Sequence, residues 1–316
     1  MKKTVGYFGS VRFFKNMILL AVIVMIAVPT GFAIHLNTRL RNTEQLLAEQ
    51  GETPVLLSST DTPRDSEADL PQTAGKRLDS DTFQAESPYA DLYPDFYAPQ
   101  ELTANVRETG VLYLTFDDGP SARTEEILDI LAEKNVKATF FVVGFQDESQ
   151  KAILQRMVAE GHTLAMHSYS HDYAKIYASV EDYLSDMYQI FSLIKETTGV
   201  TPTLFRFPGG SINGYNHGIY QELIAEMLRR GFVPFDWNIS SQDAASNSPV
   251  PAETLLNNVI NGAANVRRGV ILMHDSAAKT TTVQALAPMI DRLREQGFEL
   301  KALTPEVLPV LYSYRE

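Results

Sequence analysis

From about residue 102 onward the chain alternates short apolar runs with longer amphipathic segments, and this alternation limits the possible fold more than any other feature. The amphipathic segments, such as TEEILDILAEKN and YQELIAEMLRRG, have the periodicity of helices. The apolar runs are typical of strands and span residues 111–116, 137–143, 162–166, 203–207, 232–237, 269–274 and 298–303. Strands that alternate with helices predict an α/β fold with a parallel sheet. About seven such strands favour a closed or nearly closed (β/α) barrel over an open doubly wound sheet.

The N-terminus has the pattern of a membrane anchor. Residues 17–34, MILLAVIVMIAVPTGFAI, carry no charge and are long enough to cross a bilayer as a helix. Residues 1–16 contain four basic and no acidic side chains, so the positive-inside rule predicts a cytoplasmic basic tail. We therefore expect a single-pass protein of a bacterial-type cell membrane, with everything after residue 34 outside the cytoplasm. A cleaved secretory signal peptide, which would release the protein, is the alternative.

The segment 35–101 lacks the pattern of a packed core. Its first part could form a short helical stalk. Residues 52–108 then carry 12 acidic and four basic side chains, with scattered Pro and Ser and no apolar period. This composition predicts a disordered acidic spacer. The aromatic end of the spacer, YADLYPDFYAPQ, could alternatively pack on the folded domain, which we assign to residues 102–316.

Composition restricts both the chemistry and the partners. The 316 residues include no Cys, which excludes disulfides and thiolate metal sites. Any metal must therefore be held by Asp, Glu or one of six His. The net charge of −12 provides no basic face for a nucleic acid, and no pattern indicates a protein partner.

Polar side chains cluster at the C-terminal ends of the predicted strands, where barrels of this kind carry their chemistry. The clusters are Asp117-Asp118, His167 with His171, Arg206-Phe207-Pro208-Gly209-Gly210, Asp236-Trp237 and Leu272-Met273-His274. Each has an ordinary structural explanation, such as an Asp-Gly turn, a surface His pair or a core Trp. His167 and His171 would share one face if their segment turned helically, which suits two imidazoles on one metal. Because all the clusters fall on one rim, a joint site is the better interpretation.

The sequences TFDDGP, HSYSH, RFPGG, DW and LMH, one at each strand end, resemble the five motifs of the polysaccharide deacetylase family, also called carbohydrate esterase family four. The resemblance covers about residues 103–316. Within the family, the sequence resembles peptidoglycan N-acetylglucosamine deacetylases. It implies a distorted (β/α) barrel with about seven parallel strands. It also implies a divalent metal, with zinc first and cobalt, nickel or manganese as alternatives. The implied reaction is hydrolytic removal of acetyl groups from an amino-sugar polysaccharide in the cell wall or on the cell surface.

The resemblance also implies roles for the residues on the metal side of the site. Asp118, His167 and His171 would bind the metal and leave positions open for water and the acetyl oxygen. Asp117 would be the general base. Arg206 would pair with Asp117 and keep it ionised and oriented.

A second group of implied roles concerns the leaving amine and the acetyl group. His274 would be the general acid, oriented by Asp236. The N–H of Gly209, after Pro208, would stabilise the oxyanion. Trp237 and Leu272 would wall the pocket for the acetyl methyl. Many members have Tyr where Gly209 stands, so we expect a more open groove here.

Peptidoglycan N-acetylglucosamine is the favoured substrate. N-acetylmuramic acid, poly-N-acetylglucosamine and chitooligosaccharides are alternatives. A catalytically silent glycan-binding module on a membrane stalk is a hypothesis of another class. The complete set of Asp117, Asp118, His167, His171 and His274 argues against it, because a silent relative usually loses one of these residues.

Overall fold

The computed structural model describes residues 87–99, 106–246 and 248–312. The expected cytoplasmic tail, membrane anchor and stalk, and most of the spacer, lie outside the described residues. Within those described ranges, no helix combines the length and the apolar character needed to span a bilayer.

The described residues form one parallel sheet of eight strands, most of them close to the predicted runs. The strands are β1 (Val111–Asp117), β2 (Thr139–Val143), β3 (Thr163–Ser168), β4 (Leu204–Phe205), β5 (Val233–Pro234), β6 (Ile239–Ser240), β7 (Arg268–His274) and β8 (Glu299–Lys301). Their order is β5-β4-β3-β2-β1-β7-β6, and β8 also pairs with β1. The predicted α/β fold with a parallel sheet is confirmed, whereas the separate short strand β6 was not predicted.

The sheet must curl because its two outer strands follow each other in the chain. Seven strands in a flat sheet would hold the outer two about 29 Å apart. Only four residues separate β5 from β6, and this connection reaches at most about 17 Å when fully extended. The described strands pair as an open path that ends at β5 and β6, so the sheet is curled without a continuous ring of hydrogen bonds.

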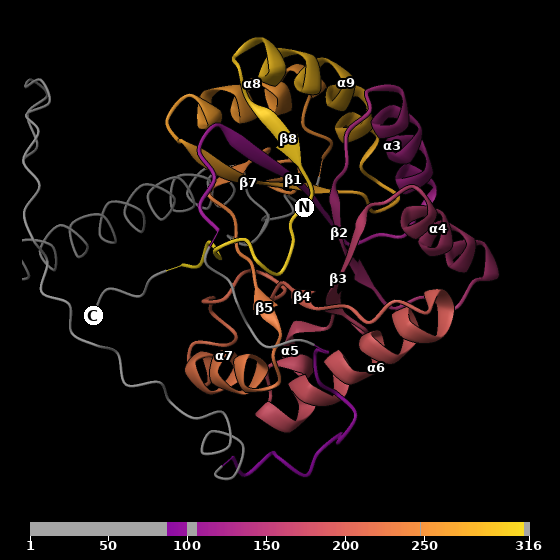
Figure 1. Ribbon diagram of the computed structural model, residues 1–316, viewed down its shortest axis with the longest axis vertical. Helices are drawn as coiled ribbons and strands as arrows, with labels where there is room; N and C mark the ends of the chain where they lie inside the picture. The colour runs from indigo at the N-terminus through magenta and orange to yellow at the C-terminus, as the bar shows by residue number, and fades with distance from the viewer. Residues whose placement is uncertain (1–86, 100–105, 247, 313–316) are drawn as a thin grey trace, which may run out of the picture. The chain divides into compact units, whose positions relative to one another are not determined.

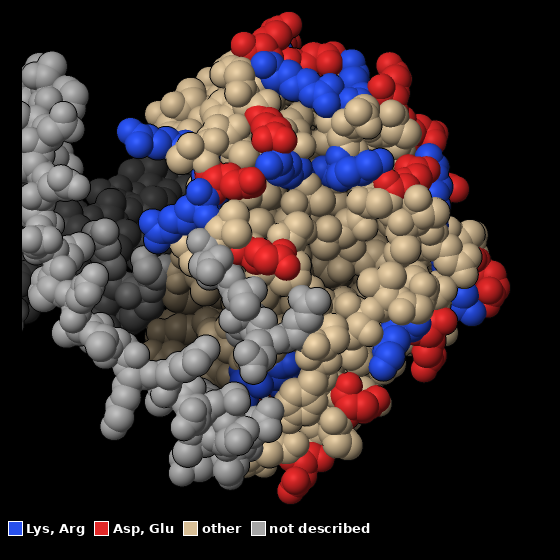
Figure 2. All heavy atoms as spheres, viewed as in Figure 1, with Lys and Arg blue, Asp and Glu red and all other residues tan. Residues whose placement is uncertain are grey.

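Helices surround the curled sheet (Figure 1). They are α3 (Ala122–Glu133), α4 (Glu148–Ala159), α5 (Tyr173–Ile176), α6 (Val180–Thr198), α7 (Tyr220–Arg229), α8 (Ala252–Ala263) and α9 (Thr280–Glu295). Local sequence sets several of their ends: Ser121 and Ser179 cap α3 and α6 through side-chain oxygens, and Gly199 ends α6 at a φ of 74°. On the face seen in Figure 2, acidic and basic side chains are interspersed around the rim.

Strand β1 explains how the fold delivers an acid to the interior of the curl. Its residues are all buried, and successive side chains point to opposite faces. Leu112 and Leu114 join the larger apolar cluster with the helices, whereas Val111 and Tyr113 join the smaller cluster inside the curl. The same alternation places Asp117 on the inner face at the C-terminal end of the strand.

Residues 87–99 pack on the domain, so the predicted spacer 35–101 does not extend through them. The Phe96 side chain is fully buried, and its ring lies 4.7 Å from that of Phe232 and 5.1 Å from that of Phe191. The buried Arg230 guanidinium donates hydrogen bonds to the carbonyl oxygens of Tyr89, Leu92, Tyr93 and Phe96. The alternative of a packed aromatic end is correct, and a catalytic fragment should begin before residue 87 rather than at 102.

Candidate active site

The acid pair lies at the C-terminal end of β1, opposite the predicted general acid. Asp117 is aligned with His274 of the neighbouring strand β7. Asp117 is buried, whereas Asp118 is partly exposed and has a φ of 76°. This left-handed backbone turns the second carboxylate away from the strand direction, so the two adjacent acids serve different neighbours.

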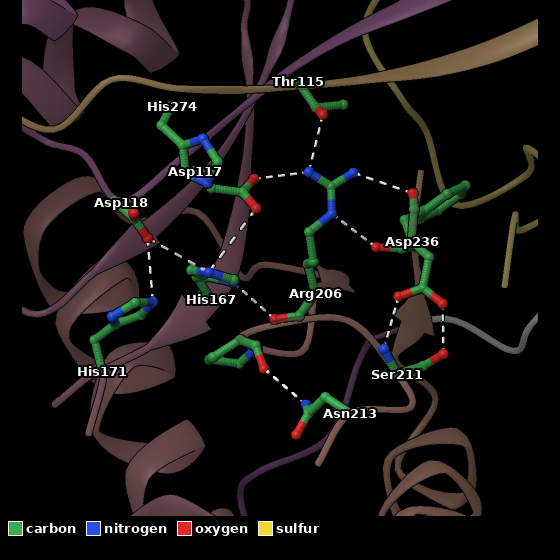
Figure 3. A network of polar contacts seen from close by, with 12 residues as sticks. Thr115, Asp117, Asp118, His167, His171, Arg206, Ser211, Asn213, Asp236 and His274 are labelled. Carbon is green, nitrogen blue, oxygen red and sulfur yellow. Dashed lines mark hydrogen bonds and ion pairs between the residues drawn. The ribbon is translucent and has the colours of Figure 1, made fainter. Parts of the chain in front are cut away.

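Asp118, His167 and His171 converge as predicted. Their candidate ligand atoms all lie within 4.8 Å of one another (Figure 3). Asp118 Oδ1 is 3.2 Å from His171 Nε2 and 3.5 Å from His167 Nε2. His167 Nδ1 lies 2.9 Å from the Arg206 carbonyl oxygen, so Nδ1 carries the proton and Nε2 presents its lone pair.

The donor set fits a divalent metal. Asp118 Oδ1 is buried and has no hydrogen-bond partner among the described residues. Burial opposes ionisation of Asp118, but His171 and His167 outweigh burial and hold its pKa well below its ordinary value. Burial lowers the pKa of His167, which keeps this imidazole neutral. One carboxylate and neutral imidazoles are ligands that zinc and similar cations accept.

His167 lies in strand β3 and His171 in the loop after it, so the segment between them does not form the helical turn that would have paired them. Strand β3 ends at Ser168, and His171 has a φ of 52°. The buried Asp186 of α6 accepts hydrogen bonds from Ser168 Oγ at 2.5 Å, the Tyr169 N–H at 2.7 Å and the Ser170 N–H at 2.8 Å. Ser168 Oγ in turn accepts the His171 N–H at 2.8 Å. The imidazoles converge because the loop folds around a carboxylate that sequence reasoning missed.

Arg206 holds Asp117, as predicted. The guanidinium is fully buried, and Nη1 donates to Asp117 Oδ1 at 2.7 Å and to Thr115 Oγ1 at 2.9 Å. Its remaining recorded hydrogen bonds go to the carbonyl oxygens of Phe235 and Asp236. With contacts to β1 and to the chain after β5, the guanidinium fixes the direction of the Asp117 carboxylate.

The partner of His274 is Asp243, so the prediction that Asp236 orients His274 is wrong. Asp243 Oδ1 lies 2.7 Å from His274 Nδ1, and Oδ2 accepts the His274 N–H and the Thr282 hydroxyl, both at 2.8 Å. Burial lowers the pKa of His274, but Asp243, Asp117 and Asp118 outweigh burial and raise it to about 9. Asp243 lies three residues after β6, the strand that was not predicted. Recognition of a second strand after residues 232–237 would have pointed to Asp243 as another residue that follows a strand end.

Asp236 has a different task. Its carboxylate accepts the Ser211 N–H at 2.8 Å, the Ser211 hydroxyl and the Tyr312 N–H at 2.7 Å. These bonds join the loop after β4 to the C-terminal segment. Asp236 therefore stabilises the loop that contains Gly209 rather than the imidazole.

Gly209 is exposed and has a φ of 78°. The preceding carbonyl, that of Pro208, accepts the Tyr177 hydroxyl at 2.7 Å and the Asn213 amide at 3.1 Å. In the described part of the chain, no acceptor takes the Gly209 N–H. A Cβ at this position would lie 2.8 Å from Cε1 of Tyr173, and the expectation of a more open groove than in members with Tyr stays a prediction. The Tyr173 ring already fills that space.

Trp237 and Leu272 lie near Arg206 and its hydrogen-bond partner Thr115. The Trp237 ring is 5.6 Å from the Arg206 guanidinium and 5.2 Å from the Tyr312 ring. Leu272 is almost fully buried on β7 and is aligned with Thr115 of β1. The strand register thus brings Leu272 beside Thr115, whose hydroxyl accepts a hydrogen bond from Arg206, whereas Trp237 lies in the connection between β5 and β6.

Comparisons with known proteins agree with this geometry. The profile of the polysaccharide deacetylase family matches residues 104–228. A peptidoglycan-N-acetylglucosamine deacetylase of Bacillus cereus is 37% identical over 205 residues, which cover 64% of this chain and 72% of the relative. The crystal structure of the catalytic domain of a peptidoglycan N-acetylglucosamine deacetylase from Eubacterium rectale has 34% identity and a TM-score of 0.63. This match covers 69% of the chain and 99% of that structure.

A crystal structure of a polysaccharide deacetylase from Bacillus cereus has 36% identity and a TM-score of 0.56, and covers 62% of the chain and 93% of that structure. The chain therefore belongs to the polysaccharide deacetylase family. It is a hydrolase that deacetylates a polysaccharide, and the predicted membership of this family is confirmed.

Proposed function

We propose that this protein is a metal-dependent deacetylase of N-acetylglucosamine in peptidoglycan, which releases acetate and leaves a free amine. The observation that carries the proposal is the convergence of Asp118, His167 and His171 beside a carboxylate held by Arg206 and an imidazole held by Asp243. The substrate comes from two of the relatives, which are peptidoglycan N-acetylglucosamine deacetylases.

Asp118, His167 and His171 would hold the metal. Bound there, a divalent cation supplies Lewis acidity toward the amide carbonyl and toward water. One carboxylate and two imidazoles favour zinc, with cobalt, nickel and manganese as alternatives.

Asp117 is the proposed general base. It accepts a proton from the water whose oxygen attacks the acetyl carbonyl carbon. The hydrogen bond from Arg206 keeps one carboxylate oxygen occupied, which leaves the other, Oδ2, for the water. Asp117 Oδ2 lies 3.9 Å from His167 Nε2, beside the proposed metal ligands.

His274 is the proposed general acid. Asp243 occupies Nδ1, so Nε2 is the nitrogen that can donate a proton to the sugar amine as the C–N bond breaks. A pKa raised to about 9, against burial and through Asp243 and the acid pair, keeps the imidazole protonated at neutral pH. The same bond fixes the direction of the ring.

The acetyl group would lie between the loop after β4 and strand β7. The exposed Gly209 N–H is the proposed donor to the oxyanion, since its backbone is fixed through the Pro208 carbonyl. Trp237 and Leu272 are the proposed walls for the acetyl methyl.

Acetate release from purified peptidoglycan tests the proposal. Chitooligosaccharides and poly-N-acetylglucosamine serve as alternative substrates, and mass analysis of the glycan separates N-acetylglucosamine from N-acetylmuramic acid as the modified sugar. We expect a chelator to abolish release and added zinc to restore it. A protein that bound these glycans but released no acetate with any divalent metal would be the silent glycan-binding module instead.

We also propose that residues 17–34 hold the enzyme in the cell membrane, with the domain outside the cytoplasm. The support is the uncharged length of this run and the basic residues before it. Membrane fractionation together with the N-terminal mass of the mature protein tests this location. An N-terminus beginning after residue 34 would instead identify a cleaved signal peptide.

A further inference from the structure

A pocket of about 570 Å³ opens beside the proposed metal site. It is lined by His171, Asp172, Tyr173, Ala174 and Tyr215. Because His171 is one of the proposed metal ligands, a molecule in this pocket contacts the edge of the reaction centre. No Lys or Arg contributes to the lining.

Two tyrosine rings form a corner in this pocket. The Tyr173 ring lies 5.4 Å from the His171 ring at 89°, and 5.3 Å from the Tyr215 ring at 60°. Tyr215 is 62% exposed, the largest fraction among the exposed large hydrophobic residues of the described chain. An aromatic ring this exposed, next to a catalytic centre, is typical of a ligand-binding surface rather than of a core.

Hydrogen bonds fix the backbone that carries Tyr215, and Gly209 leaves room for the Tyr173 ring. Asn213 Oδ1 accepts the N–H groups of Tyr215 and Asn216, at 2.8 and 3.1 Å, and Asn216 Oδ1 accepts the Asn213 N–H at 2.8 Å. Tyr173 lies against the backbone of Gly209, where any Cβ would come within 2.8 Å of its ring. The glycine is thus required for Tyr173 to stand between the histidine loop and the proposed oxyanion donor.

We infer that Tyr173 and Tyr215 form a subsite for a pyranose ring of the glycan chain, beside the sugar that loses its acetyl group. A pyranose has an apolar C–H face and a polar hydroxyl edge, which match the apolar ring and polar tip of tyrosine. The inference rests on the proposed function, since it assigns a binding surface to that same site.

The experiment uses the full-length, metal-loaded protein and chitooligosaccharides of increasing length. Tyr215→Ala should raise the KM for acetate release about tenfold, the scale of one lost aromatic contact, and change kcat less than twofold. Tyr215→Phe retains the ring and loses only the hydroxyl, so its KM should stay much closer to the wild-type value than that of Tyr215→Ala. Leu228→Ala, at an exposed leucine of α7, is the control and should leave both constants unchanged.

Calorimetric titration of the same oligosaccharides separates this inference from the proposed function. A tenfold weaker affinity of Tyr215→Ala supports the subsite even if the wild type released no acetate, a result that would contradict the proposed function alone. Equal affinity and equal KM for the wild type and Tyr215→Ala would overturn the subsite whether or not acetate is released.

Discussion

Two buried aspartates organise the two halves of the site, and they act in different ways. Asp186 directs its recorded hydrogen bonds to the loop 168–170, so it shapes the backbone that presents the metal ligands. Asp243 contacts the His274 ring itself, as well as its N–H. Asp186 therefore fixes the backbone next to the metal ligands. Asp243 fixes the His274 ring and also stabilises its positive charge. The same Asp→Asn replacement should consequently have separable effects at the two positions.

The largest effect is expected on the metal side, where the ligands themselves can be removed. His171→Ala should lower metal content and reduce activity by on the order of 10³-fold or more, because Lewis-acid stabilisation is worth several kcal/mol. His171 is partly exposed, so the domain should stay folded. Elemental analysis, acetate release and circular dichroism together check this. Full metal occupancy in the variant would show that the ligand assignment is wrong.

On the acid side, Asp243→Asn should reduce kcat by about 10²-fold, the usual scale of general acid–base catalysis. The charge of Asp243 helps to raise the pKa of His274, so its removal should move the basic limb of the pH–rate profile to lower pH. Metal content should stay at the wild-type level. Asp236→Asn is the matched control, since Asp236 bonds to Ser211 and Tyr312, and it should leave the basic limb in place. If the basic limb shifted in Asp236→Asn but not in Asp243→Asn, Asp236 would be the partner of His274 after all.

A smaller effect is expected at the carboxylate that shapes the loop. Asp186→Asn places an N–H₂ group where the carboxylate accepted N–H donors, so the histidine loop should relax. We expect metal affinity to fall about 10- to 100-fold, as for other residues that orient ligands. Competition with a metal-binding dye measures the affinity. The basic limb should stay in place, and a shift equal to that of Asp243→Asn would erase the difference between the two aspartates.

The sequence correctly placed the site residues that stand in a motif at the end of a predicted strand, because the strand itself determines where they lie. The alternation of strands and helices placed Asp117, Asp118, His167 and His274 at one edge of the sheet, and the structure has them there. The parallel α/β architecture followed from the same alternation. Its curl is a consequence of how closely β5 and β6 follow each other, which apolar runs alone do not reveal.

The contacts that sequence missed are all long-range. Asp243 reaches His274 across 31 residues, and Asp186 reaches Ser168 across 18. The Asp236-Trp237 pair at the end of a predicted strand made Asp236 the expected partner of His274. The strand before Asp243, β6, has only two residues and is too short to show a period in the sequence. Likewise, the sequence did not show that Tyr173, 36 positions earlier, lies against Gly209. Partners of this kind depend on packing between elements, and local periodicity carries no information about them.

The last prediction concerns the contribution of the His274 charge to the free energy of unfolding. In the metal-free protein, the pKa of His274 is raised to about 9, since Asp243, Asp117 and Asp118 outweigh burial, whereas an unfolded histidine titrates near its ordinary value of about 6.5. A raised folded-state pKa means that this contribution is fully present below about pH 6.5 and is lost as the pH rises through about 9. It amounts to about 3 kcal/mol. Urea unfolding from pH 6 to 10 measures it as the difference between the wild type and His274→Gln.

The subtraction removes the titrations of groups remote from His274, which the two proteins share. The wild-type advantage should therefore decline with rising pH and flatten above about pH 9. Asp243→Asn should shrink this decline, because the carboxylate that favours the imidazolium is gone, whereas Asp186→Asn should preserve it. A difference that stayed constant across this range would mean that Asp243 orients the ring without supporting its charge, and the two aspartates would then act in the same way.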